Sequence, residues 1–321
     1  MKKSLFCDIV LPKERKKPLG KERIRGMKPT SICERGYAKI NLHLDITGRM
    51  EEGYHRVETV MQTVSLFDEV TVTLTEAGFS ADCNVRGVPT DEKNIAVRAA
   101  MLFCQRTGLS RGARISIRKN IPMAAGMAGG STDGAAVLRG MNRLCGGILS
   151  IDELCELGSQ LGADVPFCIV GGTAYADGKG DILHPFPAMP DCSLVIACEG
   201  EGVSTPWGYG LLDRLYGNFE EGSDYRPRST DALRRALEKG TVDEVAKEIY
   251  NIFEEPVLAR RPVAADVRRI LCEQGAIGAM MSGSGPSVFG LFADSTEADR
   301  AADALRQAGY CPYVCRPTQS K

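Results

Sequence analysis

Residues 119–136, with the sequence KNIPMAAGMAGGSTDGAA, restrict the fold of this chain more than any other segment. The alternating residues 114–118 before it are typical of a strand, while Ala135, Leu138 and Met141 follow at the spacing of a helix. Glycines between them let backbone N–H groups approach a ligand, and a helix N-terminus adds unpaired donors and the positive end of a dipole. A strand, a glycine loop and a helix start in this order predict a phosphate-binding loop.

Two common phosphate-binding motifs do not fit this segment. No Gly-Lys-Ser/Thr follows the glycines, as the Walker loop requires, and the glycine spacing differs from that of the dinucleotide fingerprint. On composition alone, a Gly/Ala-rich helix start that serves only close packing is a second interpretation.

Composition narrows the class of protein. The 321 residues are enough for two domains with separate cores. A net charge of −1 argues against bulk nucleic-acid binding, and no run of 18 apolar residues is present to span a membrane. Twelve cysteines are scattered through apolar segments without zinc-site spacing, which is typical of free thiols in a reducing cytosol. We therefore expect a cytoplasmic protein with no nucleic-acid or membrane partner.

Residues 1–30 differ from the rest of the chain. They hold ten Lys/Arg and three Asp/Glu, a charge of +7, which leaves −8 for the remainder. Because they show no hydrophobic periodicity, we expect a disordered basic extension. A tail for nucleic acid or a membrane surface is one interpretation. The other, which we favour, is that translation starts at Met27.

Polar residues recur in three further segments. Residues 37–46 alternate as a strand, so Lys39 and Asn41 project from one face, about 7 Å apart. Most such faces are simply solvated. Asp164 stands in the turn GADVPF, where on its own it resembles an ordinary residue at the end of a helix. The string SGSG at 282–285 predicts a turn between two strands and is a weak signal by itself.

Periodicity and turn residues predict the other elements. We expect strands or hairpins at 70–74, 171–180, 192–198 and 313–314, and helices at 94–107, 150–161, 229–239, 241–254, 262–274 and 296–307. Ser150 with Glu153 and Thr241 with Glu244 have the spacing of capping boxes. Residues 217–229 are expected to form a mobile polar loop, and the prolines at 185–190 to mark a domain boundary.

Five strings, in this order, resemble those of the GHMP kinases (galacto-, homoserine, mevalonate and phosphomevalonate kinases and relatives). They are AKINL, GYH, PMAAGMAGGST, GADVPF and SGSG, and the resemblance covers residues 36–317. It implies an α+β fold with an N-terminal ATP-loop domain at 31–187, a C-terminal ferredoxin-like domain at 188–321, and an active site in the cleft between them. It also implies transfer of the ATP γ-phosphoryl group, with Mg²⁺, to an alcohol of a small molecule that carries cytidine diphosphate.

The resemblance assigns roles residue by residue. Lys39 and Asp164 correspond to the catalytic pair, and Ser131 or Thr132 is the candidate Mg²⁺ ligand. The substrate site corresponds to Asn41, Tyr54, His55 and Tyr209, with Trp207 as the alternative to Tyr209. The ATP site corresponds to Asn94, Lys119, Pro122, Met123, Ala124, Ala125, Gly126, Met127, Ala128, Gly129, Gly130, Ser131, Thr132, Ser282, Gly283, Ser284 and Gly285.

Two alternatives remain on sequence. Another GHMP kinase, of mevalonate or homoserine type, would keep the glycine loop but lack the GYH and GADVPF strings. A catalytically silent ligand-binding homologue would need neither Lys39 nor Asp164. The chain departs from the family where Ala124, Ala125 and Ala128 replace glycine; we expect no change of fold, since a methyl group is tolerated wherever φ is negative. Both a monomer and a homodimer are compatible with the sequence.

Overall fold

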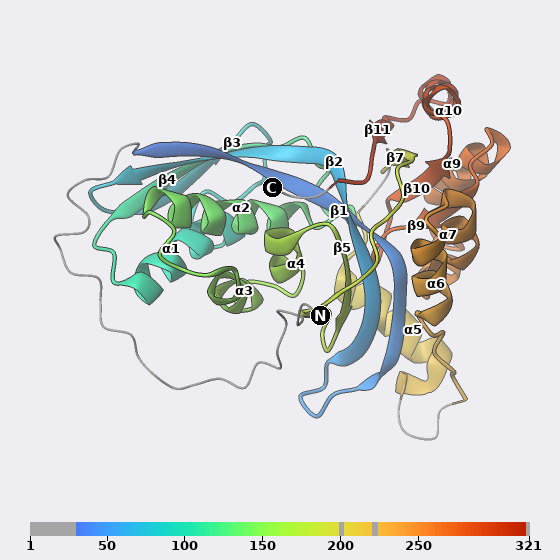
Figure 1. The fold of residues 1–321 in the computed structure, drawn as a ribbon, viewed down its shortest axis with the longest axis horizontal. Coiled ribbons are helices and arrows are strands. Elements are labelled where there is room, and N and C mark those ends of the chain that lie inside the picture. Colours follow the sequence, from blue (N-terminus) through green and yellow to red (C-terminus); the bar gives the residue numbers. More distant parts are fainter. Residues whose placement is uncertain (1–29, 199–201, 220–223, 319–321) are drawn as a thin grey trace, which may run out of the picture.

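The computed structural model describes residues 30–198, 202–219 and 224–318. Two long strands, β1 (Ser31–Arg49) and β2 (His55–Thr75), pair antiparallel and extend across both halves of the molecule (Figure 1). The predicted strands 37–46 and 70–74 are thus parts of longer ones. The expected basic extension at residues 1–30, which includes Met27, lies outside the described residues except for its last residue, Thr30.

The N-terminal half is a seven-stranded sheet covered by helices. Its path is β3-β4-β2-β1-β8, and β5 joins the other half of β2 and pairs with β6. These further strands are β3 (Phe79–Cys83), β4 (Gly112–Arg118), β5 (Thr173–Asp177), β6 (Ile182–Pro185) and β8 (Tyr250–Asn251). The covering helices are α1 (Ile95–Thr107), α2 (Gly129–Leu144), α3 (Ile151–Ser159) and α4 (Val165–Val170).

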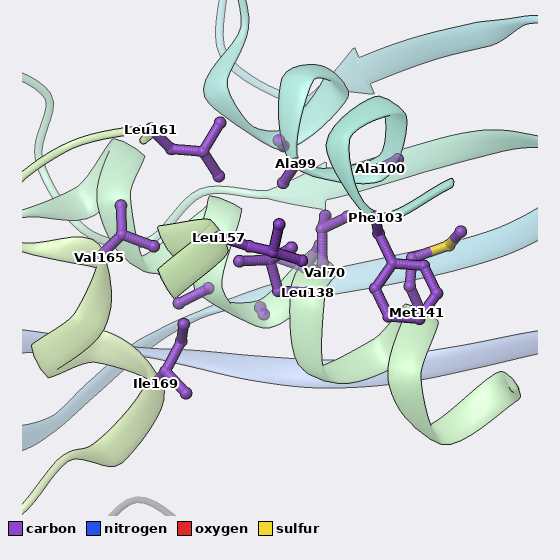
Figure 2. Packing of buried hydrophobic residues seen from close by; sticks show 14 of the residues in the cluster. Val70, Ala99, Ala100, Phe103, Leu138, Met141, Leu157, Leu161, Val165 and Ile169 are labelled. Atoms are coloured by element: carbon purple, nitrogen blue, oxygen red, sulfur yellow. The ribbon is translucent and has the colours of Figure 1, made fainter. Parts of the chain in front are cut away.

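Apolar spacing places one face of each of these helices in a common core. Phe103 of α1 and Leu138 and Met141 of α2 are fully buried and lie near Val70 of the sheet (Figure 2). Burying a side chain of this size contributes about 1.5–3 kcal/mol. The predicted capping box is confirmed at Ser150, whose hydroxyl accepts from the Glu153 N–H while the Glu153 carboxylate accepts from the Ser150 N–H.

The C-terminal half has ferredoxin-like topology, as predicted. Its four strands lie in the order β11-β7-β10-β9 with every neighbouring pair antiparallel. They are β7 (Ser193–Ala197), β9 (Gly278–Met281), β10 (Val288–Phe292) and β11 (Tyr313–Cys315). The helices are α5 (Thr205–Tyr216), α6 (Asp231–Lys239), α7 (Val242–Glu248), α8 (Glu254–Leu258), α9 (Pro262–Glu273) and α10 (Ser295–Gln307), with a 3₁₀ turn, η2 (Gly217–Phe219).

Two predictions for this half are wrong. The helix expected at 241–254 ends at Glu248, because Ile249 takes an extended conformation and the next two residues form β8, parallel to β1. Its capping box is absent: the Glu244 carboxylate accepts from Lys239 and Lys247, and Thr241 makes no side-chain cap. Helix α5 was not predicted, and it supplies one wall of the cavity described below.

The two halves share β1. Ala38, Ile40 and Leu42 on one of its faces pack in a core with Ile196 and Phe289 of the second sheet. The other face, which polar residues occupy, is also covered, and its buried members are Lys39, Asn41, His43 and Asp45. Burial of this face means that its polar groups need partners within the protein. Within the described ranges, no helix has the length and apolar character needed to cross a bilayer.

Candidate active site

A cavity of about 430 Å³ lies between the two halves. It is bordered by β1, the glycine loop, the turn before α4, the start of α5 and the turn between β9 and β10. The predicted site residues that line it are Lys39, Asn41, Ala124, Ala125, Gly126, Ala128, Gly129, Gly130, Ser131, Asp164, Tyr209, Gly283 and Ser284. Those outside the lining are Tyr54, His55, Asn94, Lys119, Pro122, Met123, Met127, Thr132, Ser282 and Gly285.

The glycine loop delivers the N-terminus of α2 to the cavity. Gly129 and Gly130 open the helix, so their N–H groups and the positive end of its dipole face this space. Ala124 and Ala128 have φ of 52° and 59°. Of the three loop alanines, only Ala125 therefore has the negative φ at which a methyl group is readily tolerated. A left-handed alanine costs roughly 1–2 kcal/mol, so the surrounding contacts must hold the loop in this shape.

The two glycine motifs touch each other directly. A Cβ on Gly126, whose φ is +75°, would lie 2.3 Å from the carbonyl oxygen of Ser282. The Ser282 hydroxyl donates to the Gly126 carbonyl at 3.1 Å and accepts from the Asn41 N–H at 3.3 Å. Only glycine permits this approach, which brings the loop at 282–285 over one side of the cavity.

Lys39 and Asp164 face each other across the cavity floor. Lys39 Nζ lies 3.8 Å from Asp164 Oδ2 and donates to Asn41 Oδ1 at 2.7 Å. Asn41 Nδ2 in turn donates to Thr59 Oγ1, whose hydroxyl donates to the His43 carbonyl. This chain of bonds fixes the position of the ammonium group. No described residue donates a side-chain hydrogen bond to the Asp164 carboxylate, which leaves it available to a ligand.

The two candidate metal ligands differ. The Thr132 hydroxyl donates to the Tyr37 carbonyl at 2.7 Å and the residue is fully buried. The Ser131 hydroxyl lines the cavity and bonds to no described residue. Ser131 therefore fits a ligand that is also held by phosphate oxygens, and Thr132 does not. The described residues contain no cluster of three or more His, Cys, Asp or Glu side chains that could hold a metal by itself.

Lys119 lies beneath the loop, not in the cavity. Its ammonium group bonds to the carboxylates of Asp68 and Asp133, and all three side chains are buried. Burial raises the pKa of Asp133 to about 7; the charge of Lys119 acts against this rise and that of Asp68 adds to it. Asp68 Oδ1 also accepts from the N–H groups of Asn120 and Ile121. The cluster thus ties β2, the loop entry and α2 together.

Most other predicted ATP-site residues outside the lining have structural contacts. The Asn94 side chain caps α1 by accepting from the Ala96 N–H, and it donates to the Pro89 carbonyl. Met127 is buried and its carbonyl accepts from the Lys39 N–H. Met123, in contrast, is half exposed.

Aromatic residues gather at and beside the cavity wall, where Tyr209 and Phe253 line the cavity. The rings of His55 and Tyr209 stack at 4.4 Å with an interplanar angle of 22°, and Phe253 meets Tyr209 edge-on. Burial raises the pKa of Tyr209 to about 12, with a smaller effect from the charge of Asp164. Tyr54 is exposed, and Lys179 Nζ lies 4.1 Å from its ring centre. Trp207, the alternative to Tyr209, does not line the cavity.

Sequence reasoning missed several lining residues. Lys179 lies in the hairpin turn between β5 and β6, where the string Asp-Gly-Lys-Gly signals a tight turn but no ligand. Thr205 and Phe253 also line the cavity, and the Thr205 hydroxyl lies 3.4 Å from that of Ser284. Nothing in their local sequence indicates this, because their position depends on how α5 and β8 pack.

A glycine loop at a helix start, a facing lysine and aspartate, and a ferredoxin-like second half together define a small-molecule kinase. Sequence models of the GHMP kinases N-terminal domain and of the GHMP kinases C-terminal domain match residues 94–172 and 233–311. The chain belongs to the GHMP kinase family, as the sequence predicted.

Individual relatives of the chain are named for particular kinase activities. A 4-diphosphocytidyl-2-C-methyl-D-erythritol kinase of Caldicellulosiruptor saccharolyticus is 43% identical over 274 residues, which are 85% of this chain and 92% of the relative. The crystal structure of a 4-(cytidine 5'-diphospho)-2C-methyl-D-erythritol kinase is similar with a TM-score of 0.71 and 31% identity, covering 89% of this chain and 100% of that one. A homoserine kinase from Cytophaga hutchinsonii has a TM-score of 0.68 at 19% identity, covering 91% of this chain and 96% of that one, and shares the fold.

Proposed function

We propose that this protein transfers the γ-phosphoryl group of ATP to the 2-hydroxyl of 4-diphosphocytidyl-2-C-methyl-D-erythritol, a step in the non-mevalonate route to isoprenoid precursors. The observation that carries the proposal is the Lys39–Asp164 pair, at 3.8 Å, facing a cavity that also receives the N-terminus of α2. The relatives named above, which are similar over most of the chain, support the choice of substrate.

Asp164 is the proposed general base. Its carboxylate is partly exposed to the cavity and accepts no side-chain hydrogen bond from the described residues, so it can accept the proton of the substrate hydroxyl. Lys39 is nearly buried and held by Asn41, which places a fixed positive charge beside the moving phosphoryl group. Phosphoryl transfer needs little covalent chemistry from the protein, so position and charge stabilisation account for most of the acceleration.

The loop backbone is proposed to hold the ATP phosphates. N–H groups at the start of α2 are the donors, and the contact between Gly126 and Ser282 keeps the two glycine loops together. Ser131 and the phosphate oxygens would hold Mg²⁺, which neutralises phosphate charge when bound. Lys119 does not contact the phosphates in this arrangement but holds the start of the glycine loop in place through its ion pair with Asp68.

The cytidine end of the substrate is proposed to bind near Tyr54, His55 and Tyr209. The exposed ring of Tyr54 can stack on a base, and Lys179 beside it suits the diphosphate. We place the reaction in the cytosol because the described cysteines are free thiols.

The second candidate is another GHMP kinase activity, such as phosphorylation of homoserine or mevalonate. Only the shared fold supports this second activity. The aromatic site next to the cavity favours the cytidyl substrate instead. A catalytically silent homologue is disfavoured because both Lys39 and Asp164 face the cavity.

One assay separates these candidates. ADP release is measured with the cytidyl substrate, mevalonate and homoserine side by side, each with ATP and Mg²⁺. We expect turnover with the cytidyl substrate and at most trace turnover with the others. Preferential turnover of mevalonate or homoserine would refute the proposal, and no turnover with any of the three would favour the silent homologue.

A further inference from the structure

Asp213 stands behind the aromatic site and has no role in the reaction described so far. It lies on α5 one turn after Tyr209, so the two side chains share a helix face. Its Oδ1 lies 2.7 Å from His55 Nε2 and 2.7 Å from Arg49 Nη2. These three side chains come from the end of β1, the start of β2 and α5, and all are mostly buried.

Arg49 holds this carboxylate in place. Its guanidinium group also donates to the carbonyls of Asn218 and Gly53. The Asp213 charge is therefore balanced by Arg49, and its bond to His55 requires only an N–H at Nε2. The positions of Asp213 and His55 are set before any ligand arrives.

The contact with Asp213 determines which His55 nitrogen carries the proton. A carboxylate only accepts, so Nε2 must be the donor, and in the neutral ring Nδ1 then presents a lone pair. No described residue bonds to Nδ1. His55 is stacked on Tyr209, which lines the cavity, so the imidazole ring lies beside the proposed base site.

We propose that Asp213 is a positioning residue that makes the enzyme select cytosine over uracil by fixing the His55 tautomer. An acceptor opposite position 4 of the base receives a hydrogen bond from the amino group of cytosine. It meets the carbonyl oxygen of uracil with two acceptors facing each other, which leaves a buried polar group unpaired. This inference rests on the proposed cytidyl substrate and specifies how its base is read.

The test compares kcat/KM for the cytidyl substrate and for its uridyl counterpart in the wild type, Asp213→Asn and Asp177→Asn. An asparagine at 213 can either donate to or accept from Nε2, so both tautomers of His55 become available. We expect Asp213→Asn to reduce the cytidyl-to-uridyl ratio by about tenfold or more, which corresponds to about 1.4 kcal/mol. Part of this change should be a gain in kcat/KM with the uridyl compound, which mere damage to the fold would not produce.

Asp177 provides the matched control. It contacts His184 Nε2 at 3.1 Å in an exposed pair that does not line the cavity. Asp177→Asn should leave the ratio unchanged. The KM for ATP should stay constant in both variants.

A second measurement needs no variant at position 213. The imidazole ¹⁵N spectrum of the wild type contains signals from only three histidines, which His43→Gln and His184→Gln assign by elimination. The neutral ring of His55 should be protonated at Nε2 and bare at Nδ1. A ring protonated at Nδ1, or an unchanged base ratio in a folded Asp213→Asn, overturns the role of Asp213 while leaving the kinase activity standing. A wild type that does not turn over the cytidyl substrate overturns both proposals.

Discussion

Lys39 Nζ lies 3.8 Å from Asp164 Oδ2, beyond the range of a direct hydrogen bond, and bonds instead to Asn41 Oδ1 at 2.7 Å. The lysine is thereby fixed by its own strand, while the carboxylate on the opposite side stays free to accept a proton. This division of contacts suits a pair in which one member stabilises charge and the other acts as base.

The left-handed alanines predict an unusual response to glycine. Ala128→Gly should leave the free energy of unfolding unchanged or raise it by up to about 1 kcal/mol, because the relief of left-handed strain exceeds the entropy added to the unfolded chain. Ala125→Gly is the control: its φ is negative and it is buried, so it should lose about 0.5–1 kcal/mol. Denaturant unfolding of the two variants measures this difference. Equal losses of unfolding free energy in both would contradict the left-handed backbone at Ala128.

The contact between the glycine loops predicts a specific defect. Gly126→Ala places a Cβ 2.3 Å from the Ser282 carbonyl, so it should lower stability and raise the KM for ATP by separating the loops. Gly147→Ala shares the positive φ, +72°, but its Cβ would meet nothing within 4 Å. It should cost only the left-handed penalty of about 1 kcal/mol and leave KM unchanged. If both variants change the KM for ATP alike, the contact with Ser282 is not what shapes the site.

How far the sequence predicted the site depended on how local each signal was. The glycine loop, the start of α1 at Asn94 and the capping box at Ser150 follow from neighbouring residues, and they were predicted correctly. The positive φ of Ala128 could not be foreseen, because alanine gives no sign of a left-handed backbone and only the contacts around the loop impose it.

Other features of the fold could not be predicted because they depend on residues far away in the sequence. Asp45 shares the polar face of β1 with Lys39 and Asn41, and most such faces are solvated, but its carboxylate accepts from the Tyr225 hydroxyl at 2.5 Å and the Arg228 N–H at 2.8 Å. These partners follow α5 in the sequence and reach β1 only in the folded chain. Helix α5 itself was missed because Pro206, Gly208 and Gly210 lower its intrinsic helix propensity, although a proline in the first turn is compatible with a helix.

Stability should fall in acid because of His43. The residue is buried, its Nε2 has no partner in the described structure, and burial lowers its pKa from 6.5 to about 4, with a smaller effect from Arg228. Between these two pH values His43 is protonated in the unfolded chain but not in the folded chain. The contribution of neutral His43 to the free energy of unfolding is therefore complete above pH 6.5 and is lost as pH falls towards 4. At about 1.4 kcal/mol per pKa unit, its upper limit is about 3 kcal/mol.

His43→Gln tests this contribution because glutamine does not titrate. Unfolding free energies of the wild type and the variant are measured from pH 7 to pH 4. Their difference should change across this range in favour of the variant as pH falls. A difference that stays constant with pH would show that His43 accepts its proton equally well in both states.

The kcat of Asp164→Asn with the cytidyl substrate tests the central claim most directly. The change keeps the size of the side chain and removes the proton acceptor, so kcat should fall by about 10²-fold or more, while calorimetry shows unchanged ATP binding. Lys39→Ala should also lower kcat strongly, and the double variant should be little worse than either single one if the two residues act as a unit. Near-normal turnover by a folded Asp164→Asn enzyme would contradict the account, because the substrate proton would then leave by a route that does not involve this carboxylate.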